Sequence, residues 1–83
     1  MRYKNHTTEK TQSNTYRIYN ADGVHVGTIQ ENKDWKNRPG IQRYRAKGAK
    51  RHPEYANRTA YGNTVTDALH VFIDNPSRTY KLQ

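Results

Sequence analysis

The sequence predicts an α+β domain in which a three-stranded antiparallel sheet packs against one C-terminal α-helix. Three observations predict this class. Residues 15–30 have the alternating pattern and turn residues of a β-hairpin, and residues 41–47 alternate in the same way. Apolar residues then recur at helical spacing between residues 64 and 73. A chain of 83 residues has room for one small core, so we expect these elements to form a single domain.

The hairpin is indicated by two alternating segments on either side of a turn. Thr-Tyr-Arg-Ile-Tyr at 15–19 precedes Asn-Ala-Asp-Gly at 20–23, and Val-His-Val-Gly-Thr-Ile follows. Side chains alternate between the two faces of a strand. We therefore expect an inner face with Tyr16, Ile18, Val24, Val26, Tyr44 and Ala46, and an outer face with Arg17, Tyr19, His25, Arg43 and Arg45.

The segment Ile-Gln-Arg-Tyr-Arg-Ala-Lys at 41–47 separates into two chemically different faces when it is extended. One face carries Arg43, Arg45 and Lys47, and the other carries Tyr44 and Ala46. Charged side chains are rarely buried without partners, so the cationic face is expected to meet water or a polyanion. Residues 59–61 are a candidate for a short fourth strand.

The helix is predicted to begin after Asn63 or Thr64, either of which can cap it, and to end at Asp-Asn-Pro, residues 74–76. Asp67 lies in the first turn, where the helix dipole favours an acid. The apolar stripe that should lie on the sheet consists of Val65, Ala68, Leu69 and Phe72.

The predicted domain spans residues 15–75, with a polar segment on either side. Residues 1–14 lack apolar periodicity and are expected to form a flexible N-terminal arm, and residues 76–83 a flexible C-terminal tail. In the loop at 31–40, Trp35 is interpreted as a lid on the core or, alternatively, as an exposed stacking platform.

Composition indicates a soluble cytoplasmic protein with a strongly basic segment. The chain has no Cys, so it can form neither disulfides nor a thiolate metal site, and it has no apolar run that could span a bilayer. The formal charge is +8. Most of the excess positive charge lies in residues 33–58, which contain nine Lys and Arg residues and two acids.

The sequence has few of the features that are typical of an enzyme active site. Its four His residues have no spacing typical of a metal site, and neither a phosphate-binding glycine loop nor a nucleophile elbow is present. His52 and Glu54 could serve as an acid and a base, but their short polar loop favours a solvated surface. We therefore predict a protein without enzymatic activity, cofactor, metal or small-molecule substrate.

Cations interleaved with aromatic residues favour a nucleic-acid partner. Lys and Arg neutralise phosphates, Arg can form two hydrogen bonds to guanine, and aromatic rings stack on bases. We predict binding of nucleic acid, DNA rather than RNA, through the outer face of the sheet and a basic loop. The alternative is an accessory or inhibitory protein of phage type that uses the same surface against an acidic protein. The candidate binding residues are Arg17, Tyr19, Arg43, Arg45, Lys47, Lys50 and Arg51.

The order of elements resembles two kinds of DNA-binding module, AP2-type domains and the arm-binding N-terminal domains of phage tyrosine integrases. The resemblance covers about residues 15–75 and is carried by Tyr-Arg-Ile-Tyr-Asn at 16–20, the Asp-Gly turn at 22–23, Arg-Tyr-Arg-Ala at 43–46 and Tyr-Gly-Asn-Thr-Val-Thr-Asp-Ala-Leu at 61–69. In those families the sheet enters the major groove. The resemblance implies that Arg17, Tyr19, Arg43 and Arg45 lie at the bases. The loops at 30–40 and 47–58 depart from the families, which leaves the docking register open.

Overall fold

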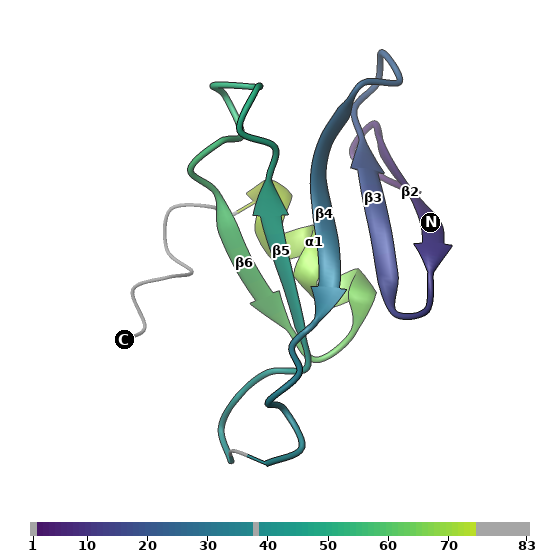
Figure 1. The fold of residues 1–83 in the computed structure, drawn as a ribbon. Helices are drawn as coiled ribbons and strands as arrows, with labels where there is room; N and C mark the ends of the chain where they lie inside the picture. The colour runs from purple at the N-terminus through teal and green to yellow at the C-terminus, as the bar shows by residue number, and fades with distance from the viewer. Residues whose placement is uncertain (1, 38, 75–83) are drawn as a thin grey trace.

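The computed structural model describes residues 2–37 and 39–74, and within them the chain forms six strands and one helix (Figure 1). Each strand pairs antiparallel with the next one along the chain, so a single sheet has the order β1-β2-β3-β4-β5-β6. The elements are β1 (Arg2–Tyr3), β2 (His6–Gln12), β3 (Thr15–Tyr19), β4 (His25–Glu31), β5 (Tyr44–Gly48), β6 (Thr59–Gly62) and α1 (Val65–Asp74).

The predicted α+β class, an antiparallel sheet with one C-terminal helix, is confirmed, but the sheet of the described residues has six strands instead of the predicted three. Strands β3, β4 and β5 correspond to the predicted ones, and β6 to the candidate fourth strand. The first two strands come from residues that we expected to form a flexible arm. The predicted C-terminal tail, residues 76–83, lies outside the described residues.

Two tight turns connect the N-terminal strands. Lys4 and Asn5 both have positive φ angles, 45° and 65°, and they join the paired residues Tyr3 and His6. Positive φ at both central residues is the geometry of a type I′ hairpin turn, whose twist matches that of the strands. Asn14, with a φ of 56°, has the same left-handed conformation in the turn from β2 to β3.

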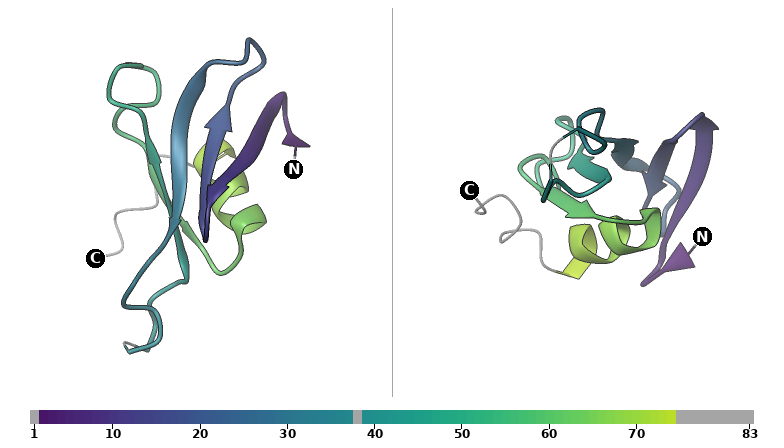
Figure 2. Two further views of the ribbon diagram at one scale, coloured as in Figure 1. Left: turned by 45° about the vertical axis from the view of Figure 1, so that its right-hand side comes forward. Right: turned by 90° about the horizontal axis from the view of Figure 1, so that it is seen from below.

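Helix α1 begins as its sequence predicts. The Thr64 hydroxyl accepts a hydrogen bond of 3.0 Å from the backbone N–H of Asp67, which satisfies one of the free amides of the first turn. Ala68, Leu69 and Phe72 are fully buried against β4, β5 and β6. The sheet curves around this helix, so its concave face is covered and its convex face is open (Figure 2).

A β-bulge near the start of β4 decides which residues reach the core. Ile18 pairs with Gly27 and Tyr19 with His25, so one residue of β4, Val26, lacks a partner. Because of this shift, Val26 and Ile29 are both fully buried, although they are three positions apart and would lie on opposite faces of a regular strand. The expected inner position of Val24 is wrong: this residue precedes β4 and is 37% exposed.

The described residues include no helix with the length and apolar character that crossing a membrane requires.

Candidate nucleic-acid interface

The convex face of the sheet, called here the outer face, displays two rows of side chains that run across the strands. Residues directly opposite each other on paired strands point to the same face, so the register defines each row. The first row is Glu9, Arg17, Thr28, Lys47 and Thr59, and the second is Gln12, Thr15, Gln30, Arg45 and Tyr61. Residues next to these along the strands, such as Ile18, Ile29 and Ala46, are buried on the concave face.

Three of the predicted binding residues lie on this face with their charges free. Arg17, Arg45 and Lys47 are exposed, and in the described part of the chain they form no side-chain hydrogen bond or ion pair. Arg17 projects from β3 and the other two from β5, so β4 runs between them. The outer face therefore carries positive charge on both sides of its central strand.

Tyr19, also a predicted binding residue, is the last residue of β3 and lies beside the turn that leads to β4. Its hydroxyl donates a hydrogen bond of 3.1 Å to Glu9, and its ring centroid is 5.9 Å from that of His25. The Glu9 carboxylate belongs to the same row as Arg17. The positive potential should accordingly be weaker over β2 than over β5.

Arg43 is placed differently from the other predicted cations. It precedes β5, and its Nε donates a hydrogen bond of 2.8 Å to Glu31, with which it forms an ion pair. The guanidinium carbon lies 4.7 Å from the ring centroid of Trp35 and 5.3 Å from that of Tyr44. The charge of Arg43 is thus engaged by Glu31 in a partly exposed ion pair, and the expectation that Arg43 shares the outer face with Arg45 is not met.

Glu31 is the centre of this internal cluster. Besides Arg43, its carboxylate accepts hydrogen bonds from the indole N–H of Trp35 at 3.1 Å and from the side-chain amide of Asn14 at 3.2 Å. The half-buried Trp35 is fixed by these contacts at the end of the sheet, beside the loop that joins β4 to β5. Its ring is held against a cation rather than offered as a free stacking surface.

Lys50 and Arg51 project from the loop between β5 and β6 and are exposed. The loop is anchored by Tyr55, whose ring stacks on Phe72 at a centroid distance of 5.9 Å and whose hydroxyl is 2.9 Å from Nε2 of His6. Burial raises the pKa of Tyr55. The two exposed cations therefore extend the basic surface beyond the end of β5 from an anchored loop.

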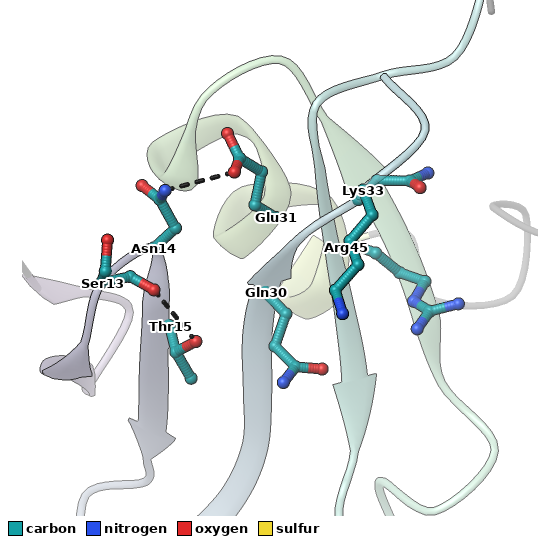
Figure 3. Close-up of a pocket in the computed structure, with 8 residues that line it drawn as sticks. Ser13, Asn14, Thr15, Gln30, Glu31, Lys33 and Arg45 are labelled. Atoms are coloured by element: carbon teal, nitrogen blue, oxygen red, sulfur yellow. Dashed lines mark hydrogen bonds between the residues drawn. The ribbon is translucent and has the colours of Figure 1, made fainter. Parts of the chain in front are cut away.

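A polar hollow of about 480 Å³ lies at one end of the outer face (Figure 3). The hydrogen bond between Asn14 and Glu31 borders one side, and Gln30, Lys33 and Arg45 border the other. Side chains from the second row thus have free space beside them.

The N-terminal hairpin is attached to the helix on the opposite side of the molecule. The ring of Tyr3 stacks on His70 at 3.8 Å, its hydroxyl donates to Asp74, and Lys4 Nζ lies 2.8 Å from the same carboxylate. The hydrogen bond to Asp74 raises the pKa of Tyr3 and that of Lys4, and the hydrogen bond from Lys4 lowers the pKa of Asp74. Lys4 is therefore a structural cation.

Sequence reasoning missed several neutral members of the two rows, among them Thr28 and Gln30 on β4 and Tyr61 on β6. After the bulge at Val26, the side chains of β4 lie on the faces opposite to those that simple alternation predicts, so only the strand register could identify Thr28 and Gln30. Within the residues that the structure describes, no three His, Asp or Glu side chains are grouped as a metal site requires. No protein-family model, curated protein or solved structure matches this chain.

Proposed function

We propose that this protein binds double-stranded DNA by placing the outer face of its sheet in the major groove. The observation that carries the proposal is the set of free cations on both sides of β4, namely Arg17 on one side and Arg45 and Lys47 on the other. Between these cations, β4 places the neutral, polar side chains of Thr28 and Gln30 on this face, which suits contact with base edges.

The dimensions of the face are compatible with this arrangement. Neighbouring strands are about 4.8 Å apart, so Arg17 on β3 and Lys47 on β5 start roughly 10 Å from each other. The major groove of B-DNA is about 12 Å wide. A convex sheet that enters the groove at β4 therefore brings one cation toward each phosphate wall. The deep, narrow major groove of A-form RNA does not admit such an element, which favours DNA.

The division of cations into free and engaged ones supports the same conclusion. Lys4 and Arg43 form ion pairs, and Arg58 donates a hydrogen bond of 3.1 Å to the backbone oxygen of Phe72 near the end of α1. These three stabilise the fold. Other cations of the described residues form no ion pair or side-chain hydrogen bond. Five of them lie on the outer face or on the loop that follows β5 and are available to phosphates, namely Arg17, Arg45, Lys47, Lys50 and Arg51. Lys10, opposite Tyr16, and Lys33, in the loop after β4, lie outside this set.

The experiment is a fluorescence anisotropy titration of a duplex with the protein at several salt concentrations. If three to five cations contact phosphates, log K should fall with log [salt] with a slope of roughly −3 to −4.5. Lys47→Gln should reduce the magnitude of this slope by about 1. The matched control is Lys10→Gln, because Lys10 is exposed but lies opposite Tyr16 and not in either row.

The proposal fails if the duplex does not bind at about 50 mM salt, where the electrostatic contribution is large. It also fails if Lys10→Gln and Lys47→Gln weaken binding equally, since binding would then depend on net charge alone. A protein partner that remains bound after nuclease treatment and is lost in Lys47→Gln would support the acidic-protein alternative instead.

A further inference from the structure

Gln30 and Arg45 form a directly opposed pair on the outer face, beside the hollow at its end. They are register partners on β4 and β5, and both are exposed. Among the described residues neither side chain has a hydrogen-bond partner. The neighbouring Thr28 differs, because its hydroxyl lies 3.1 Å from Nε2 of His25. The pair therefore presents a free amide and a free guanidinium side by side.

These two groups have complementary base preferences. A Gln amide donates and accepts at once, so it matches the N6 and N7 edge of adenine, and a guanidinium donates twice to O6 and N7 of guanine. Because the pair borders the open hollow, both side chains have space in which to orient toward a ligand (Figure 3).

We infer that Gln30 and Arg45 determine sequence specificity by reading two adjacent base pairs, one A·T and one G·C; this rests on the proposed binding of duplex DNA. The strands that carry them are about 4.8 Å apart, and successive base pairs are about 3.4 Å apart along the duplex. Two long side chains that start at this separation reach neighbouring base pairs more readily than distant ones. Arg17 and Lys47, on the flanking strands of the other row, contact phosphates and carry no sequence information.

The test is selection of bound duplexes from a randomised library, followed by affinity measurement. The wild-type protein should enrich sites that contain an A·T pair next to a G·C pair, and replacing either pair should weaken binding by about 5- to 160-fold. Gln30→Arg should change the A·T preference to G·C, because Arg reads guanine. The control is Gln12→Arg, which adds the same charge to the second row two strands away on β2 and should keep the wild-type site.

The outcomes separate this inference from the proposed function. Binding of duplexes without enrichment overturns the specificity pair and leaves DNA binding in place, whereas absence of duplex binding overturns both. An unchanged site for Gln30→Arg also overturns the inference. Gln30→Glu provides a second readout, since Glu accepts a hydrogen bond from cytosine and should move the preference to C·G. Thermal unfolding monitored by circular dichroism verifies that each variant is folded.

Discussion

Arg43 and Arg45 are two residues apart in the sequence, but of the two only Arg43 has side-chain partners among the described residues, so replacing each with Ala should separate stability from the proposed binding. Arg43 is held by Glu31 and Trp35, whereas Arg45 projects from the outer face without a partner in the described part of the chain. We expect Arg43→Ala to lower stability with little effect on the affinity for DNA. Arg45→Ala should do the reverse.

The loss of stability can be worked out from the contacts of Arg43. Its ion pair with Glu31 is partly exposed, with side-chain exposures of 39% and 24%, so we assign it about 1 kcal/mol after solvent screening. The stacking of the guanidinium on Trp35 adds about 0.5–1 kcal/mol. A total of about 1.5–2 kcal/mol corresponds to a decrease in Tm of roughly 6–16 °C for a domain of this size. Arg45→Ala should remain within about 0.5 kcal/mol of the wild type.

Circular dichroism gives Tm, and anisotropy titrations give the affinity for the selected duplex site. Arg45→Ala is expected to weaken binding by about 5- to 160-fold because it removes a contact to guanine, and Arg43→Ala to leave the affinity unchanged at a temperature where the variant is folded. The different roles of the two residues are refuted if Arg43→Ala melts like the wild type and weakens binding as much as Arg45→Ala does.

Two further predictions concern the packing of the helix and the attachment of the N-terminal hairpin. Gly27→Ala should destabilise the protein by about 1–3 kcal/mol, because the added methyl would lie 2.8 Å from the ring of Phe72 and 2.9 Å from a backbone oxygen of β5. Urea unfolding measures this loss, and an unchanged midpoint would contradict this packing. The pKa of Asp74 is lowered, so its contribution to stability is complete above the ordinary value of 3.8 and is lost as the pH falls through the lowered value. The pKa values of Tyr3 and Lys4 are raised, so their contributions to stability are complete below about 10 and are lost at higher pH. The protection factors of the β2 amides, which correct for the intrinsic pH dependence of exchange, should therefore fall at both extremes in the wild type, and Asp74→Asn should remove the fall on the acid side.

The elements that the sequence predicts are those whose apolar pattern is local. Ile18 in β3 and the stripe ending at Phe72 in α1 indicate their faces by spacing alone, and both residues are fully buried. Strands β1 and β2 lack such a pattern because β2 has no apolar residue. Contacts distant in sequence, such as that of Tyr3 with His70, fix this hairpin to the helix, and no local pattern reveals them.

The outer face was predictable only in part for the same reason. Alternation along residues 41–47 correctly places Arg45 and Lys47 on the same face. It also groups Arg43 with them, because the sequence does not show that Glu31 lies next to Arg43 across the strands. Gln30 is not identified because the bulge reverses the faces of the β4 residues that follow Val26, and a bulge depends on how two strands pair.

The central claim is that the convex side of the sheet, and not the helix, contacts DNA. The most direct measurement is an NMR titration of the isotope-labelled protein with a short duplex, following backbone amide shifts. We predict that the largest changes occur in β3, β4 and β5, including Arg17, Gln30 and Arg45, with little change at Ala68 and Leu69 in the buried face of α1. Changes confined to α1 and the N-terminal hairpin, or no changes at low salt, would contradict the claim.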